Sequence, residues 1–164
     1  MSPPVQKPSC MYTTVHVQFG SLVLMIAPTT AIDNTGRQAR MKALVLTDRG
    51  DTEYVELPAG DPEQALREVV GGPLNPLPLT HLADHLDLWT LFEPLSTVTV
   101  GGIGYNDVAS QIATAGVGTP RAVIGTAVLT AHTDSGILAA LSPHDCAALD
   151  RIIAEIYTGY RTAG

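Results

Sequence analysis

The chain predicts an α+β domain in which a small mixed or antiparallel sheet of about four or five strands packs with about three helices. Segments with alternating apolar residues and segments with helical spacing follow one another without the regular strand and helix alternation of a doubly wound sheet. Hydrophobic residues make up 45% of the 164 residues and charged residues only 15%, which is typical of a globular core. Because aromatic residues account for just 5%, we expect that core to be aliphatic.

A change of composition at Met41 marks the expected start of this domain. Residues 1–40 carry three basic residues and one acidic residue, a net charge of +2, whereas residues 41–164 carry six basic and fifteen acidic residues, a net charge of −9. We therefore expect one domain over 41–164, with 1–40 as a non-core N-terminal extension or an artefact of the start site. Two alternatives stay open, a docked strand in the apolar run at 15–26 and a targeting peptide. That run is short for a secretory signal or a membrane span.

The first part of the domain predicts a β-hairpin followed by a helix. Residues 41–47 and 52–58 have strand patterns, and the DRGD turn at 48–51 joins them. The segment DPEQALREVV at 61–70 has helical spacing. Its capping signals are Asp61 as N-cap, Pro62 at the first helical position, and Gly71 and Gly72 at the end.

The middle of the domain predicts two further strands. Residues 72–79 contain three prolines, so they can form only an edge strand or an extended loop. Residues 81–95 are ambiguous, because their first half has helical spacing and their second half alternates. We favour a strand from Leu86 to Glu93, on which Trp89 is more typical of the core than of a binding surface.

The last part predicts a helix, an apolar strand and a final helix. Asn106 is a natural N-cap for the first of these helices, whose apolar stripe comprises Val108, Ala109, Ile112 and Ala113. Residues 121–132 form a strongly apolar strand in which Gly125 indicates a bulge or a close approach. The final helix opens with a near capping box made by Ser142, Pro143 and Asp145.

The acidic balance excludes some classes of partner. The isoelectric point is about 5.0 and the basic residues after Met41 are scattered, so we expect no nucleic-acid binding, and we expect no membrane partner. The two cysteines, Cys10 and Cys146, lie on opposite sides of the expected boundary, which favours a reducing, cytoplasmic setting over a disulfide framework. No motif indicates a cofactor, so none is predicted.

Three histidines form the candidate metal site. His81 and His85 are four residues apart, a spacing that puts both rings on one face of a helix, and a carboxylate or the remote His132 could complete a tetrahedral site. The segment lacks the glutamate of an HExxH motif that would supply a general base. The alternative is a solvated polar turn, in which the spacing has no meaning.

The glycine-rich turn GGIGYND is the candidate ligand site. Glycines ahead of a helix can leave backbone N–H groups facing an anion, with help from the helix N-terminus. The turn is neither a Walker A loop nor a complete GxGxxG motif, and no lysine follows it to meet a phosphate. The alternative is a plain turn with an asparagine cap. The predicted ligand contacts are Gly102, Gly104, Tyr105 and Asn106.

No complete catalytic set is identified, so no catalytic residue is predicted. His132, Asp134 and Ser135 are the residue types of a hydrolase triad, but the segment AHTDSG is more typical of a turn. Cys146 stands near His144, yet it falls on the apolar stripe of the last helix. This position favours a core cysteine over a nucleophile.

Several short motifs along the domain carry a family resemblance. They are a helix that ends in Gly-Gly, an Asn-x-x-Ala-Ser motif, and an Ile and Gly in a strand that precedes a further Gly and Leu; the positions are Gly71, Gly72, Asn106, Ala109, Ser110, Ile124, Gly125, Gly136 and Leu141. In these positions the chain resembles a family of short uncharacterised domains of bacteriophages, plasmids and their actinobacterial or firmicute hosts. The resemblance covers 41–164, departs from the family pattern between Phe92 and Gly104, and implies a fold and a mobile-element setting without an activity.

The leading hypothesis is a non-enzymatic accessory protein of a phage or mobile element that binds a host protein or a small ligand. The glycine-rich turn and the acidic surface are its expected contacts. A first alternative is a small metal-dependent or acid/base hydrolase that uses His81, His85 and His132. A second alternative is a structural homo-oligomer, in which copies pair to bury a sheet edge.

Overall fold

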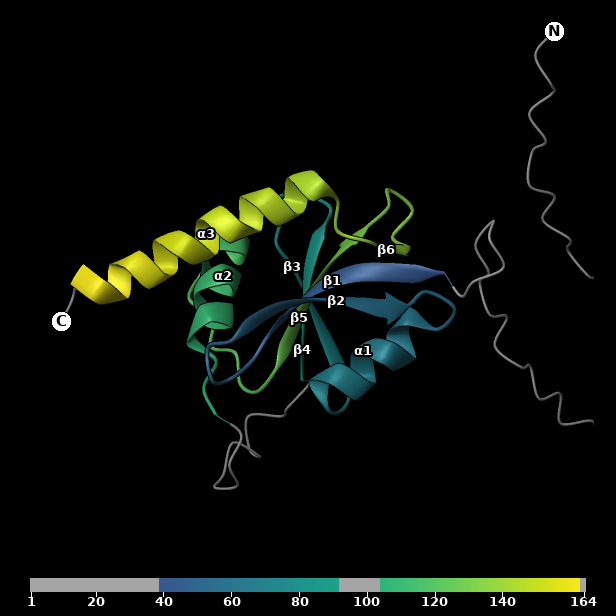
Figure 1. The fold of residues 1–164 in the computed structure, drawn as a ribbon, viewed down its shortest axis with the longest axis horizontal. Helices are drawn as coiled ribbons and strands as arrows, with labels where there is room; N and C mark the ends of the chain where they lie inside the picture. Colours follow the sequence, from purple (N-terminus) through teal and green to yellow (C-terminus); the bar gives the residue numbers. More distant parts are fainter. Residues whose placement is uncertain (1–38, 92–103, 163–164) are drawn as a thin grey trace, which may run out of the picture.

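A computed structural model describes residues 39–91 and 104–162, which form one sheet and three helices (Figure 1). The predicted α+β class is confirmed. The apolar run at 15–26 and Glu93 lie outside the described residues. The elements in chain order are β1 (Arg40–Leu46), β2 (Thr52–Pro58), α1 (Pro62–Val70), β3 (Leu74–Pro78), β4 (Leu86–Leu91), α2 (Asp107–Val117), β5 (Ala127–His132), β6 (Leu138–Ala139) and α3 (Pro143–Thr162).

The sheet is antiparallel throughout, and its strands lie in the order β2-β1-β5-β4-β3, with the two-residue β6 paired to the end of β5. The predicted hairpin of β1 and β2 is confirmed, and its ladder begins one residue before Met41, where Arg40 pairs with Pro58. β6 is not among the predicted strands, because two residues carry no period of their own. None of the described helices is both long and apolar enough to cross a bilayer.

One face of the sheet carries α2 and α3 (Figure 1). Leucines of the central strands point into this layer, and Leu88 and Leu129 are fully buried there. From the helices, Ile112 of α2 and Leu149 of α3 are equally inaccessible. The predicted apolar stripe of α2 is therefore confirmed, and this layer is the larger of the two cores.

α3 is also fixed to the β1–β2 hairpin. The hydroxyl of Tyr54 donates to the backbone oxygen of Cys146 at 3.0 Å and lies 2.9 Å from Oδ1 of Asp150, and the hydroxyl of Tyr157 donates to the backbone oxygen of Gly50. Burial, followed by the hydrogen bond to the Asp150 carboxylate, raises the pKa of the Tyr54 phenol above its ordinary value. Cys146 packs against the core beside this contact, in agreement with the predicted structural role.

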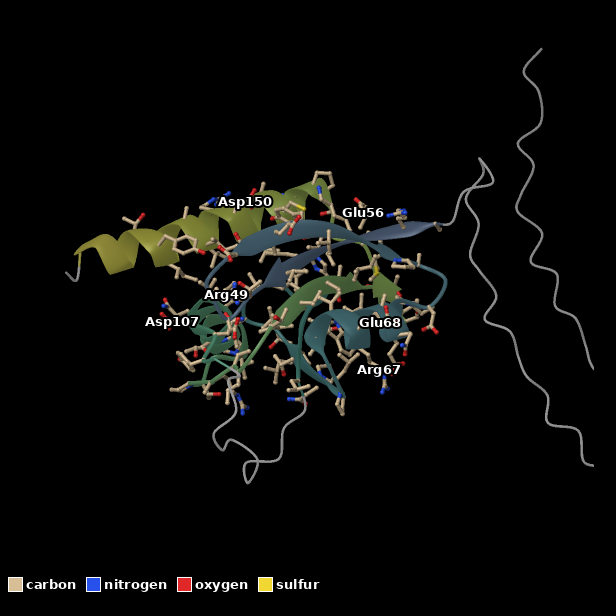
Figure 2. The ribbon with its side chains drawn as sticks, turned by 60° about the horizontal axis from the view of Figure 1, so that its bottom comes forward. Arg49, Glu56, Arg67, Glu68, Asp107 and Asp150 are labelled. Atoms are coloured by element: carbon tan, nitrogen blue, oxygen red, sulfur yellow. The ribbon has the colours of Figure 1, made fainter. Side chains whose placement is uncertain are left out.

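Among the described elements, α1, a helix of nine residues, is the one that covers the opposite face. Leu66 and Val70 of α1 pack on Val128 and on the first two strands, and Trp89 borders this smaller core. The predicted caps are confirmed, since Asp61 accepts from the backbone N–H of Gln64 and Gly71 closes the helix in the left-handed conformation. Charged side chains such as Glu68 of α1 and Asp150 of α3 lie on the outside of the domain (Figure 2).

β3 is an edge strand, which is one of the two predicted forms of this segment. The backbone N–H of Leu79 donates to Leu86 of β4, so by alternation residues 76 and 78 direct their nitrogens away from β4. Both of these residues are proline. At these two positions the outer edge of β3 therefore has no N–H to donate to another strand.

Candidate functional site: a pocket beside α1

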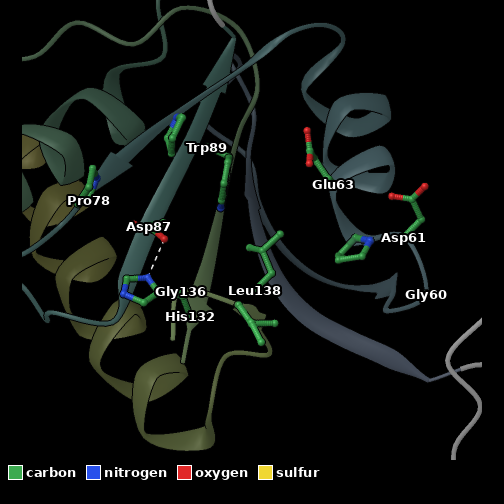
Figure 3. Close-up of a pocket in the computed structure, with 12 residues that line it drawn as sticks. Gly60, Asp61, Glu63, Pro78, Asp87, Trp89, His132, Gly136 and Leu138 are labelled. Carbon is green, nitrogen blue, oxygen red and sulfur yellow. Dashed lines mark hydrogen bonds and ion pairs between the residues drawn. The ribbon is translucent and has the colours of Figure 1, made fainter. Parts of the chain in front are cut away.

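A pocket of about 630 Å³ lies on the α1 face of the sheet, where the short helix leaves the strands uncovered (Figure 3). We refer to it as the α1-side pocket. One wall is formed by β3, β4 and β5, the opposite wall by the first turn of α1, and a third side by the turn between β5 and β6. The lining residues are Gly60, Asp61, Pro62, Glu63, Pro76, Pro78, Asp87, Trp89, His132, Gly136, Ile137 and Leu138.

Asp87 and His132 form a pair on the strand wall. Oδ2 of Asp87 lies 2.7 Å from Nδ1 of His132, and the side chains are 13% and 25% exposed respectively. The register brings them together, because Asp87 faces Thr130 across the ladder and His132 is two residues further along the same side of β5. A carboxylate at Nδ1 favours the tautomer with its proton on that nitrogen, which leaves Nε2 as an acceptor for a ligand.

Trp89 supplies the largest apolar surface of the pocket. Its Nε1 donates to Oγ1 of Thr130 at 2.8 Å, so the orientation of the indole is fixed and its polar atom is satisfied. Pro76 and Pro78 lie opposite Trp89 and Asp87 in the register, and their rings extend the wall on the same face. Trp89 thus borders both the smaller core and the pocket.

The helix wall adds two carboxylates. Asp61 caps α1, and Glu63 forms an ion pair with Arg67, one turn further along the helix, in which both side chains are about half exposed. Ile137, at the end of the β5–β6 turn, is 65% exposed, which is high for a large apolar residue. Within the described part of the chain, no lysine or arginine lines the pocket. Its polar lining is therefore acidic apart from His132.

The structure does not bring the three predicted metal ligands together. The ring of His81 lies against Gly118 at the end of α2, Nε2 of His85 lies 2.9 Å from Oδ1 of Asp145 on α3, and His132 contacts Asp87 in the pocket. Over residues 39–91 and 104–162, no group of three His, Cys, Asp or Glu side chains is arranged to hold a metal ion. The four-residue spacing loses its meaning because the segment is a turn that leads into β4 and not a helix.

Asp145 belongs to the predicted capping box of α3, and His85 docks on it. Ser142 donates from its backbone N–H at 2.9 Å and from its hydroxyl at 2.7 Å to Oδ2 of Asp145, while Oγ of Ser142 accepts from the backbone N–H of Asp145. Burial raises the pKa of Asp145, but the hydrogen bonds from Ser142 and His85 outweigh it and place the pKa below its ordinary value. His85 is thus a structural partner of α3.

In the described part of the glycine-rich turn, the backbone N–H of Gly104 already has a partner within the protein. The backbone N–H of Gly104 donates to Oδ2 of Asp48 at 3.2 Å, so a carboxylate from the β1–β2 turn already takes the place expected for an anionic ligand. Gly102 lies outside the described residues. Tyr105 is 57% exposed and borders a shallower pocket of about 290 Å³ on the surface of α2.

The side chain of Asn106 is 0% exposed and forms hydrogen bonds to several parts of the fold. Its Nδ2 donates to the backbone oxygens of Leu46 at 2.9 Å and Gly125 at 2.8 Å, and its Oδ1 accepts from the backbone N–H of Ala109 at 3.0 Å. The predicted N-cap is therefore confirmed, and the same side chain also ties α2 to β1 and to the turn before β5. Such an asparagine has no polar group left to offer a ligand in this conformation.

The segment with triad-like residues forms a turn between β5 and β6. The backbone N–H of Gly136 donates to Thr133, and the hydroxyls of Thr133 and Ser135 lie 2.8 Å apart. His132 turns instead to Asp87, a partner that the sequence pattern does not single out. One available signal is the alternation on β4, which places Asp87 and Trp89 on one side of the strand and Leu86, Leu88 and Thr90 on the other.

No match to this chain was found among protein-family models, curated proteins or solved structures. Inferences about function therefore rest on the residues and geometry of the chain itself.

Proposed function

We propose that the protein is a non-enzymatic binding protein that holds a small ligand in the α1-side pocket. The observation that carries this proposal is the placement of Trp89, Asp87 and His132 in a pocket beside α1, the one described helix on that face of the sheet. The setting in a phage or mobile element rests on the family resemblance of the sequence alone. The sequence also leads to the hypothesis that the protein binds a host protein. In that alternative, the same pocket surface is the expected contact for the partner.

The pocket has the features of a small-molecule site. Its volume of about 630 Å³ lies within the usual range of roughly 300–1,000 Å³ for such sites. A fixed aromatic ring and two proline rings offer apolar contact, and a few polar groups can orient a ligand. Because these groups stand on strands, they are held in place before a ligand arrives, which lowers the entropic cost of binding.

A fragment screen on the full chain tests this proposal directly. Trp89 is the only tryptophan in the sequence, so intrinsic fluorescence reports on this pocket. We expect some fragments to shift or quench the emission of Trp89, and we expect Trp89→Phe to weaken the same fragments in calorimetric titrations. Tyr105→Ala, at the shallower pocket, is the matched aromatic control and should leave their affinity unchanged. If no fragment perturbs Trp89, or if Tyr105→Ala abolishes binding, the proposal is wrong.

A second candidate function is acid/base hydrolysis, and the 2.7 Å contact between Asp87 and His132 favours it. A carboxylate that orients an imidazole is the arrangement by which Nε2 can take a proton from water or from a nucleophile. Of the three histidines first considered for such chemistry, only His132 lines the pocket. Turnover of a panel of esters and amides should then disappear in His132→Gln and persist in His85→Gln. Equal turnover in both variants, or none in the native protein, would remove this candidate.

A further inference from the structure

We infer that the α1-side pocket selects a small organic cation, an amine or guanidinium carried on a flat apolar body. This inference deepens the proposed function and rests on it. It names the chemical class of ligand, whereas the proposed function requires only that some small ligand binds there.

The charges on the two facing walls point to a cation. Asp61 and Glu63 stand on the helix wall and Asp87 on the strand wall, with Trp89 between them (Figure 3). Among the lining residues that the structure describes there is no lysine or arginine, and Arg67 reaches only Glu63 from the next turn of α1. An anion in this space would meet unfavourable charge from both walls, whereas a cation would gain from each of them.

The N-terminus of α1 also borders the pocket, and a helix N-terminus normally attracts anions. In α1, groups of the protein itself already satisfy or oppose this attraction for anions. The carboxylate of Asp61 accepts from the backbone N–H of Gln64, Pro62 has no N–H to offer, and Glu63 adds a second negative charge to the same turn. The helix end therefore does not reverse the preference of the pocket for positive charge.

The apolar surfaces define the body of the ligand. Trp89 is held by its bond to Thr130, so its ring cannot turn away from an occupant. A flat ligand can stack on the indole, and an ammonium or guanidinium group beside that ring gains a cation–π contact. In the tautomer whose Nδ1 proton is directed to Asp87, Nε2 of His132 is an acceptor for an N–H of the same group.

Three probes of nearly equal shape test the inference on the full chain: 2-phenylethylamine, 2-phenylethanol and phenylacetate. Their affinities are measured by quenching of Trp89 and by calorimetry. We expect the amine to bind about tenfold more tightly than the alcohol, in keeping with one cation–π contact and partly screened carboxylates. Phenylacetate should bind more weakly than the alcohol.

A double variant, Asp61→Asn with Glu63→Gln, removes the charge of the helix wall while keeping a good N-cap, because asparagine caps as well as aspartate. We expect it to reduce the preference for the amine over the alcohol by several fold, with the affinity for the alcohol unchanged. Glu68→Gln removes one charge from the outward side of α1 and is the matched control, which should keep the native preference.

The possible outcomes separate the two proposals. If amine and alcohol bind equally well, or if the double variant keeps the full preference, the cation inference is overturned and the binding function stands. If phenylacetate binds most tightly of the three probes, the cation inference is likewise overturned and the binding function stands. If all three probes and every fragment of the wider screen fail to bind, both the inference and the proposed function are wrong.

Discussion

The two faces of the sheet are built from the same strands but in opposite ways. On β4, Leu86 and Leu88 point into the layer of α2 and α3, while the intervening Asp87 and Trp89 point toward α1. On β5 the same alternation separates Leu129 from His132. One face buries apolar side chains under two helices, and the other keeps polar groups at the wall of a pocket. Neighbouring residues of one strand should therefore differ in what they contribute, stability on one side and recognition on the other.

The largest effect is expected from the covered face. Leu88→Ala removes a fully buried side chain between the sheet and its two helices and should lower the free energy of unfolding by about 3 kcal/mol, because the cavity can close only partly. Urea denaturation monitored by circular dichroism measures this loss. Leu88→Met, which conserves volume, should cost under about 1.5 kcal/mol. A loss for Leu88→Ala no larger than that for Leu88→Met would show that this layer is not the main core.

Asn106→Ala should have the next largest effect, about 2 kcal/mol, because it removes the N-cap of α2 and leaves the backbone oxygens of Leu46 and Gly125 without their donor. Asn106→Ser, which keeps a capping oxygen but not the amide donors, should fall between Asn106→Ala and the native protein. Thermal and urea unfolding of the three proteins give the order. Binding of pocket ligands should be retained in both folded variants, and its loss would contradict the separation of the faces.

Acid should weaken the covered face through Asp145. The pKa of Asp145 in the folded protein lies below its ordinary value of 3.8. The carboxylate therefore stabilises the fold fully above about pH 3.8, and this stabilisation is lost as the pH falls through the lowered pKa. Asp145→Asn should cost about 1 kcal/mol at neutral pH, as for loss of a capping interaction. The difference in the free energy of unfolding between the native protein and Asp145→Asn should shrink when urea unfolding is repeated at increasingly acidic pH. Asp84→Asn, at an exposed position, is the control and should show no such difference.

The smallest effect on stability, and the largest on binding, is expected on the α1 face. Asp87→Asn keeps the shape of the side chain but removes the charge that holds His132, and we expect it to change the free energy of unfolding by less than about 1 kcal/mol. Affinity for a cationic pocket ligand should fall by about tenfold. Urea unfolding and titration of 2-phenylethylamine on the same sample give both numbers. A large loss of stability with unchanged affinity would reverse the roles assigned to the two faces.

The sequence predicts local structure well and the site poorly, and the reason is distance along the chain. The caps at Asp61, Asn106 and Ser142 act within three residues of their partners, so their residue types suffice to locate them. The contact between Asp87 and His132 spans 45 residues and depends on the register of β4 against β5.

The same limit applies to the glycine-rich turn and to the histidines. Asp48, which accepts the hydrogen bond from the N–H of Gly104, lies in a turn 56 residues earlier. The sequence around Gly104 therefore does not predict this contact. The spacing of His81 and His85 would matter only on a helix, and the prediction of that element was itself ambiguous. β6 exists only because Leu138 and Ala139 meet the end of β5.

Pro76 and Pro78 restrict strand pairing at the β3 edge of the sheet. Their rings belong to the pocket wall, whereas their nitrogens face the open side of β3. A polypeptide that extended the sheet at β3 would find no donor at two alternate positions, which disfavours strand pairing at this edge. The proposed pocket instead opens on the face of the sheet, between α1 and the β5–β6 turn, so a ligand there would need no contact with this edge.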